Sequence, residues 1–326
     1  MSSMYGFLTY ESDIYRKRGW INLGDYVQTL AAKQFLPVSG IPISRDDMSN
    51  YHGERVKMIM NAWYMDSPEN FPPSKNIDPF YTSIHINSVV ADKMFSAEAI
   101  SHFKLFSPIG CRDHYTVNLL SKYDIPAYYS GCMTLTLGES YKRYHCTDDI
   151  YFVDVMYDAL TLSELARQPL RFAKRILNGR VFEFSHKMKV MHQYFDEDLL
   201  SKAKFMTQIA PYVSFSDGLK MAHDFLLKLS SAKLVVTSRI HTALPCLAMG
   251  TPVIFINGGF KNKIDNCRFD GLLDLFNRID VDNKGKGVAN FRFLENRVNY
   301  NTAISNSDEH LKYTSALIES CRKFID

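Results

Sequence analysis

The order of apolar and polar positions along this chain predicts alternating strands and helices. Short apolar runs rich in β-branched residues are typical of strands buried on both faces, and stretches with helix-spaced apolar residues separate them. The stretch 67–79 is rich in Pro, Ser and Asn and is expected to be a loop. The pattern predicts strands over 4–9, 56–60, 84–90, 127–129, 150–155, 181–184, 234–236 and 253–256, and helices over 25–36, 97–103, 113–122, 196–208, 217–229, 242–249 and 310–325.

This alternation indicates an α/β fold with largely parallel sheets. A polar stretch, 141–149, separates two series of elements and is the candidate linker. We therefore expect two Rossmann-like halves that face each other across a cleft, an N-terminal domain over 1–142 and a C-terminal domain over 148–326. The terminal helix is long enough to pack back on either half, including the N-terminal one.

The stretch 233–259 combines a buried strand, a polar turn and a helix, and it is the first candidate site. Proline is tolerated in the first turn of a helix, so Pro245 predicts a helix that begins with Thr242 as its N-cap. Arg239 and His241 then lie just ahead of the free N–H groups of Thr242 and Ala243, which makes an anion site with phosphate as the natural guest. Residues two apart on an extended chain face the same side, so the arginine and the histidine are expected to meet one ligand. An arginine in an internal salt bridge and a histidine that only caps a helix explain the same residues equally well.

Two further turns before helices carry candidate residues. Arg112 follows Gly110, whose missing side chain allows close approach, and an arginine holds a carboxylate or phosphate through two parallel hydrogen bonds. The structural alternative is an arginine paired with Asp113 or Asp124. Asp25 is placed as the N-cap of the first long helix, which explains it without any chemistry, and it is also a candidate base.

The remaining candidates are weaker, and no metal site is expected. The sequence has no HExxH, no cysteine cluster with zinc spacing and no GxGxxG fingerprint. Lower-ranking contacts to a ligand are expected from Gly24, Ser238, Gly258 and Arg268.

Composition places the chain among ordinary globular proteins. Its residues are 46% apolar and 22% charged, and the net charge of +3 is too small to argue for a nucleic-acid partner. Neither a signal peptide nor an apolar stretch of membrane-spanning length is visible, so a cytoplasmic protein is expected. A basic set is a candidate for peripheral contact with the inner face of a membrane, although a solvated helix face is favoured: Arg167, Arg171, Lys174 and Arg175.

Three separated segments carry a resemblance to a known family. They are NLGDYVQTLAAKQFLP (22–37), SPIGCRDHYTVNLLSKYDIPAYYSGCMTLTL (107–137) and VTSRIHTALPCLAMGTPVIFI (236–256), and in this order they resemble the polysaccharide pyruvyltransferase family. The resemblance implies a GT-B-like fold. It also implies transfer of pyruvate from phosphoenolpyruvate onto two hydroxyls of a sugar, commonly galactose in a cell-surface polysaccharide, with formation of a cyclic ketal and release of phosphate. No cofactor is expected beyond this donor.

The resemblance also suggests roles for the candidate residues. It implies that Arg239 and His241 contact phosphoenolpyruvate, and it favours Arg112 as a further contact. His241 is the first candidate for the general acid or for a donor to phosphate, and Asp25 is a weaker candidate for the base on the acceptor side. The acceptor is expected to be a sugar or a lipid-linked oligosaccharide, and a homodimer is a prior expectation.

Two alternatives remain open at this point. A GT-B glycosyltransferase that uses a nucleotide sugar would share the fold and the phosphate-binding helix. It needs an acidic residue shortly after that helix; 253–259 offers none, whereas Asp265 and Asp270 lie further on. A non-catalytic glycan-binding protein is the other alternative, and it gives no reason for Arg112, Arg239 and His241 to gather in one place.

Overall fold

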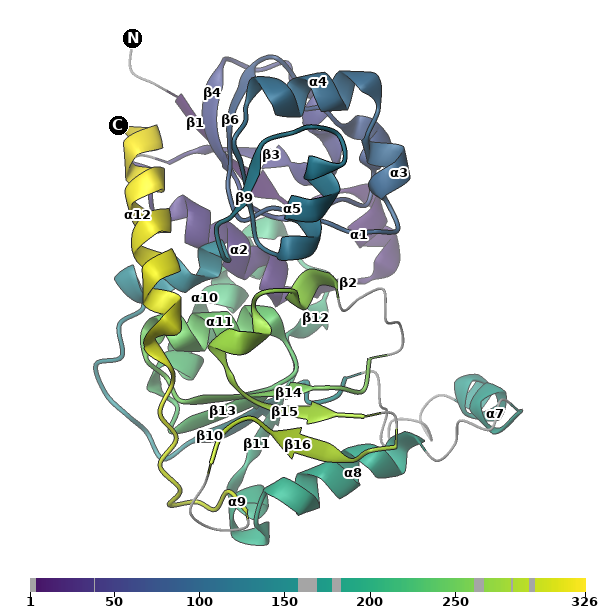
Figure 1. Ribbon diagram of the computed structural model, residues 1–326, viewed down its shortest axis with the longest axis vertical. Coiled ribbons are helices and arrows are strands. Elements are labelled where there is room, and N and C mark those ends of the chain that lie inside the picture. Colours follow the sequence, from purple (N-terminus) through teal and green to yellow (C-terminus); the bar gives the residue numbers. More distant parts are fainter. Residues whose placement is uncertain are drawn as a thin grey trace.

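Two mostly parallel sheets organise the chain, one in each half (Figure 1). The computed structural model describes residues 4–37, 39–157, 169–177, 183–260, 267–282, 284–292 and 297–326. Its mixed α/β character with mostly parallel strands confirms the predicted α/β class with largely parallel sheets, whereas the GT-B-like arrangement of two Rossmann-like halves stays a prediction. Among the described residues, no helix has both the length and the apolar character needed to cross a membrane.

The N-terminal half is built on a four-stranded parallel sheet with the order β3-β1-β4-β6. A second parallel pair, β8 and β9, lies beside it, because Ile84 bridges to Cys111 of β8. The elements of this half are β1 (Met4–Thr9), α1 (Asp13–Arg18), β2 (Trp20–Asn22), α2 (Leu23–Lys33), β3 (Ile41–Ser44), β4 (Val56–Met60), β5 (Trp63–Tyr64), β6 (Ile77–Tyr81), β7 (His85–Ile86), α3 (Ala91–Met94), α4 (Ala97–Leu105), β8 (Ile109–Cys111), α5 (His114–Ser121), β9 (Ala127–Tyr129) and the 3₁₀ helix η3 (Met133–Glu139).

The C-terminal half is built on a six-stranded sheet with the order β11-β10-β13-β14-β15-β16, in which only β16 is antiparallel. The strands β12 and β2 pair across the two halves. The elements are β10 (Ile150–Val153), α7 (Pro169–Leu177), α8 (Glu183–Tyr194), α9 (Glu197–Lys202), β11 (Lys204–Met206), β12 (Ile209–Pro211), α10 (Phe215–Ser231), β13 (Leu234–Thr237), α11 (Ile240–Met249), β14 (Val253–Asn257), β15 (Asn277–Val281), β16 (Gly287–Ala289) and α12 (Leu311–Ile325).

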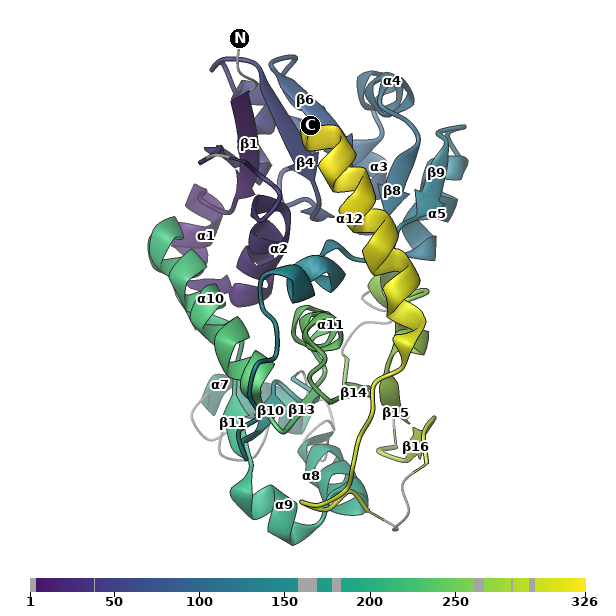
Figure 2. The same ribbon diagram turned by 90° about the vertical axis from the view of Figure 1, so that its left-hand side faces the viewer.

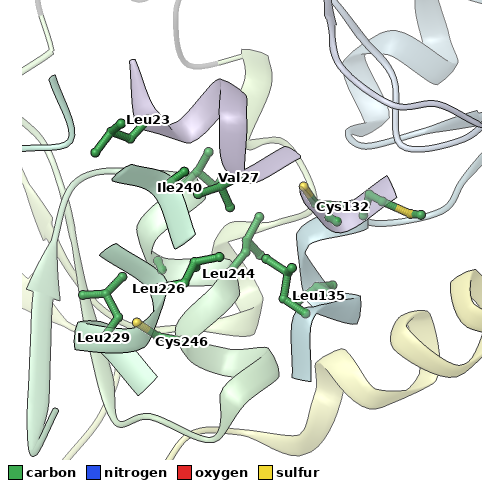
Figure 3. Close-up of a cluster of buried hydrophobic side chains, with 14 of the residues drawn as sticks. Leu23, Val27, Cys132, Leu135, Leu226, Leu229, Ile240, Leu244 and Cys246 are labelled. Carbon is green, nitrogen blue, oxygen red and sulfur yellow. The ribbon is translucent and has the colours of Figure 1, made fainter. Parts of the chain in front are cut away.

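A layer of helices between the two sheets joins the halves through one apolar core. Val27 of α2, Leu135 of η3, Leu226 of α10 and Leu244 of α11 belong to the same buried cluster (Figure 3). The cluster also takes in side chains from both sheets, including Phe7 of β1 and others from β13 and β14. Because apolar burial is the main stabilising term in folding, this shared core fixes how the ends of α2 and α11 meet.

The last helix, α12, runs from the C-terminal half to the N-terminal sheet (Figure 2). Its ring at Phe324 stacks on Phe80 of β6 with centroids 5.2 Å apart. The Tyr5 hydroxyl donates to the Ile325 carbonyl at 3.0 Å, and Lys57 Nζ donates to the Phe324 carbonyl at 3.0 Å. The C-terminal end of α12 is therefore packed against β1, β4 and β6 of the N-terminal sheet.

Several predicted elements are confirmed, and others are wrong for identifiable reasons. Strands β1, β4 and β9 have the predicted bounds, and Asp113 caps α5 by accepting from Thr116 N. The expected loop over 67–79 contains the start of β6, and the expected strand over 84–90 is only the two residues of β7.

Two predictions in the C-terminal half also need correction. The helix predicted over 196–208 ends at Lys202, because 204–206 pairs with β10 as the strand β11 and tertiary pairing overrides local helical spacing. Of the strand predicted over 181–184, Glu183 and Phe184 open α8, whereas 181 and 182 lie outside the described residues. Of the basic set, Arg167 also lies outside them, and the others lie in α7, where their side chains are not described.

Candidate functional site

A pocket of about 250 Å³ lies between the two halves, beyond the carboxyl ends of β8, β10 and β13. Such strand ends are where open parallel sheets bind ligands. Both halves contribute to its wall. The lining includes six of the predicted residues, Asp25, Arg112, Ser238, Arg239, His241 and Arg268.

Helix α11 begins two residues earlier than predicted. Its N-cap is Arg239, in extended backbone, and Thr242 is the third helical residue, so the prediction of Thr242 as N-cap is wrong. Pro245 consequently lies in the second turn, where it removes the hydrogen bond that the His241 carbonyl would accept. The N–H groups of Thr242 and Ala243 both donate to the Arg239 carbonyl, at 3.1 and 3.0 Å, so they do not point to a ligand.

Arg112 and His241 are in direct contact across the two halves. Arg112 Nη1 donates to His241 Nε2 at 3.1 Å and lies 3.3 Å from Gln28 Oε1. Because arginine stays protonated, the histidine must accept through Nε2 and carry its proton on Nδ1. Burial, followed by the charge of Arg112, lowers the pKa of His241 well below its ordinary value. His241 is therefore neutral, and it is not an acid in the unliganded protein.

Arg239 has the internal ion pair that the structural alternative predicted, and it also lines the pocket. Its Nε donates to Asp154 Oδ2 at 3.0 Å, and its guanidinium carbon lies 3.8 Å from the ring centre of Tyr157. Asp154 also accepts from Gln208 N at 3.0 Å. The guanidinium is thus held in one plane at the pocket wall, which is the preorganisation that planar recognition of an anion requires.

Asp25 lies in the first turn of α2 rather than at its cap. The cap is Asn22, whose side chain accepts from Gly24 N, so the prediction of Asp25 as N-cap is wrong. The carboxyl lines the pocket and is only 6% exposed. Burial raises the pKa of Asp25 to about 6, although Arg45 opposes the shift. A carboxyl with this pKa exchanges protons near neutral pH.

The other predicted contacts have structural roles. Gly24 and Gly258 do not line the pocket: a Cβ on Gly24 would lie 3.1 Å from His241 Cβ, and one on Gly258 would lie 2.6 Å from Val281 Cβ. Ser238 lines it, but its hydroxyl accepts from Met156 N and donates to the Ile256 carbonyl. Side chains that lie away from the pocket or are already bonded are weak candidates for ligand contact.

Two arginines of the pocket have buried donors without an acceptor among the described residues, Nε of Arg112 and Nε of Arg268. An unsatisfied buried donor is costly, so both positions favour an anion as partner. Among the described residues, the charged side chains of the lining are those of four arginines, Arg18, Arg112, Arg239 and Arg268, and one carboxyl, that of Asp25. The pocket suits a small ligand with more than one negative charge.

Residues that the sequence reasoning missed also line this pocket, among them His85, Gln208 and the tryptophans Trp20 and Trp63. His85 Nδ1 lies 2.7 Å from Asp113 Oδ2. The only signal in the sequence was indirect, since Asp113 was noted as a cap and His85 lies in the stretch 84–90 that was predicted to be extended. In the part of the chain that the structure describes, no group of three or more His, Cys, Asp or Glu side chains is arranged to hold a metal.

Comparison with known proteins gives a match to a family model and a weaker similarity to a solved structure. The family model described as polysaccharide pyruvyl transferase matches residues 22–259. Among solved structures, an uncharacterized protein from Klebsiella pneumoniae is similar at 12% identity with a TM-score of 0.43, covering 83% of this chain and 89% of that one. No curated protein matches. The matched range contains the predicted residues from Gly24 to Gly258 and leaves Arg268 outside.

Proposed function

The chain belongs to the polysaccharide pyruvyl transferase family, and from that premise we propose that it transfers pyruvate from phosphoenolpyruvate to a sugar. In this reaction two hydroxyls of the acceptor, commonly galactose in a cell-surface polysaccharide precursor, bond to C-2 of the donor. The product is a cyclic ketal, and phosphate leaves. One hydroxyl proton ends on the former methylene carbon, and the other ends on phosphate, so no cofactor is needed.

The observation that carries this proposal is the pair of unsatisfied arginine donors on one small pocket. Phosphoenolpyruvate brings a phosphate and a carboxylate, so it needs at least two cationic regions. Arg112 and Arg268 supply buried Nε donors, Arg239 supplies a guanidinium held in place, and the first turn of α11 adds its dipole. His241 is the group that we assign to the leaving phosphate, because an anion beside it favours the protonated ring and offsets Arg112.

The N-terminal wall of the pocket supports an acceptor sugar there. Trp20 and Trp63 line it, and indole rings are suited to packing against the C–H side of a sugar. We therefore propose a GT-B-like division, with residues 1–142 on the acceptor side and residues 148–326 on the donor side, except that Arg112 contacts the donor from the N-terminal half. A cytoplasmic enzyme that acts on free or lipid-linked sugars, with peripheral membrane contact or as a homodimer, stays a prediction.

Calorimetric titration with phosphoenolpyruvate, UDP and GDP tests the donor. The expected result is binding of phosphoenolpyruvate alone, with loss of that binding in Arg239→Ala. Binding of a nucleotide without phosphoenolpyruvate would contradict the proposal and would favour a glycosyltransferase. A matched control is Arg143→Ala, because Arg143 contacts the Gly250 and Ala232 carbonyls away from the pocket.

Release of phosphate tests the reaction itself. Phosphate is expected only when phosphoenolpyruvate and a β-galactoside with free neighbouring hydroxyls are both present, and mass spectrometry should show the ketal on the sugar. Phosphate release that is independent of any sugar would contradict transfer.

A further inference from the structure

His85 and Asp113 form a buried pair that the roles assigned above do not use. We propose that His85 is a catalytic base of this reaction, taking a proton from the attacking acceptor hydroxyl through Nε2 while Asp113 holds the ring by Nδ1. This inference rests on the proposed function and deepens it.

The carboxylate of Asp113 is held in place by hydrogen bonds other than the one to His85. One carboxylate oxygen accepts from Thr116 N and from Thr116 Oγ1, both at 2.8 Å, and the other lies 2.7 Å from His85 Nδ1. Burial works against its charge, but the pKa of Asp113 is nevertheless held below its usual range by His85, Arg112 and Thr116. An ionised carboxylate accepts hydrogen bonds only, so the proton of the pair lies on Nδ1 of His85 and Nε2 keeps its lone pair.

His85 is the member of the pair that reaches the pocket wall. His85 lines the pocket, whereas Asp113 does not, and the Nε2 edge lies opposite the Nδ1 edge that Asp113 holds. Nε2 is buried and has no hydrogen-bond partner among the described residues. A histidine oriented by a carboxylate on one side, with an unpaired nitrogen on the other, is the arrangement that removes a proton from a hydroxyl in many acyl-transfer enzymes.

The surroundings keep His85 neutral, as a base must be. Burial lowers its pKa, Asp113 acts in the opposite direction, and the charges of Arg112 and Arg268 lower it further. His241, the other histidine of the pocket, is committed to Arg112 through its own Nε2. His85 is thus left as the pocket histidine whose Nε2 lone pair has no partner among the described side chains.

With this pair as the base, different side chains remove the proton from the acceptor hydroxyl and deliver a proton to C-3 of the donor. When the acceptor oxygen bonds to C-2 of phosphoenolpyruvate, its O–H bond breaks and the proton goes to His85 Nε2. The electron pair of the C-2–C-3 double bond takes a proton at C-3, and Asp25 is the group that we assign to deliver it, because burial keeps part of this carboxyl protonated. Attack by the second hydroxyl then breaks the bond from C-2 to the phosphate oxygen, and its proton leaves with phosphate. The proton on His85 Nε2 then returns through solvent to the Asp25 carboxylate, which restores both groups. Two protons therefore leave the sugar and two reach the products.

His85→Gln tests the role of the base. Turnover is expected to fall by about 10²–10⁴-fold, while the dissociation constant for phosphoenolpyruvate changes by less than about threefold. Asp113→Asn is expected to lower turnover by at least about tenfold, since an amide no longer fixes the proton on Nδ1. The control is His102→Gln: His102 bonds to the Tyr81 hydroxyl outside the pocket, and this variant should keep full turnover. Unchanged turnover in His85→Gln, or loss of donor binding with it, would overturn the proposal.

Nitrogen NMR of the histidine rings gives a readout that needs no substrate. With His85→Gln to assign the signal, wild-type His85 should show a neutral ring with the proton on Nδ1 at pH 7.5, and Asp113→Asn should change this pattern. A ring protonated on Nε2 would overturn the assignment even in a folded, active enzyme. If the wild type neither binds phosphoenolpyruvate nor releases phosphate, the proposed function is refuted, and the NMR result alone then decides whether His85 is a free base in this pocket.

Discussion

Arg112 and His241 are 129 positions apart in the sequence, yet Nη1 of the arginine lies 3.1 Å from Nε2 of the histidine. The contact joins a turn of the N-terminal half to the first turn of α11 in the C-terminal half. The arginine donates through Nη1 to an uncharged ring, so its positive charge is not neutralised by this partner. Its Nε has no acceptor among the described residues and can donate to an anion.

Replacing Arg112 should affect both binding and the titration of His241. Arg112→Met removes a positive neighbour, so the pKa of His241 should rise toward its ordinary value. Arg112→Lys keeps the charge but loses the planar donor set, and the affinity for phosphoenolpyruvate should fall by about tenfold or more. Histidine NMR titration and calorimetry check the two results. An unchanged affinity in both variants would remove Arg112 from the donor site.

Arg239→Ala and His241→Ala should each lower turnover by at least about a hundredfold without loss of the fold. A preorganised group that stabilises developing charge is worth about 3–4 kcal/mol of barrier. Turnover is measured by phosphate release at saturating donor and acceptor, with circular dichroism as the check on folding. Arg143→Ala is the matched control. Near-normal turnover in either variant would show that the replaced residue is not catalytic.

Asp25→Asn should trade activity for stability in a pH-dependent way. The pKa of Asp25 in the folded protein is about 6, above the value of about 4 in an unfolded chain, so the folded state holds the proton more tightly. The wild type therefore loses stability as pH rises from about 4 to 6, by about 3 kcal/mol in total, and the loss persists above pH 6. The asparagine variant lacks this loss.

Urea unfolding at pH 4 and pH 7.5 measures the difference for Asp25→Asn. The variant should gain stability relative to the wild type at pH 7.5 and lose that advantage at pH 4, while turnover falls. A stability difference that is equal at the two pH values would show that Asp25 does not titrate in this range in the folded protein.

Gly24→Ala should disturb the meeting of α2 and α11. The added Cβ would lie 2.9 Å from Gln208 Nε2 and 3.1 Å from His241 Cβ. The amide end of the glutamine side chain can move away from the added methyl group. His241 Cβ cannot move alone, because it is attached to the backbone of α11, so the start of this helix should shift together with the histidine ring. Turnover should therefore fall, while most of the free energy of unfolding is kept. Gly138→Ala is the contrasting variant: its Cβ would lie 2.2 Å from the Ala248 carbonyl oxygen, and overpacking against backbone should cost about 1–3 kcal/mol. Thermal unfolding together with steady-state kinetics separates the two. Equal losses of stability would contradict the distinction.

The sequence predicted what depends on local patterns and missed what depends on contacts between the halves. Strands such as β1 and β4 and the Asp113 cap follow from periodicity and capping chemistry. The start of α11 was misplaced because Pro245 was assumed to be in the first turn. His85 was missed because its orientation and tautomer depend on Asp113. Asp113 lies 28 positions away in the chain and comes close to His85 only in the folded protein.

Because α12 packs on the N-terminal sheet, the contacts of that sheet cannot be complete until synthesis has reached α12. The Tyr5 hydroxyl bonds to the Ile325 carbonyl, which lies 320 positions later in the sequence. At about 5–20 residues per second, the time between synthesis of these two residues is on the order of tens of seconds. Until then Phe80 has no Phe324 to cover it. During synthesis, this part of the N-terminal sheet therefore lacks its apolar cover until α12 has been made. Loss of Phe324 and Ile325 would therefore remove contacts from β1, β4 and β6, although these strands lie more than 240 positions earlier in the sequence.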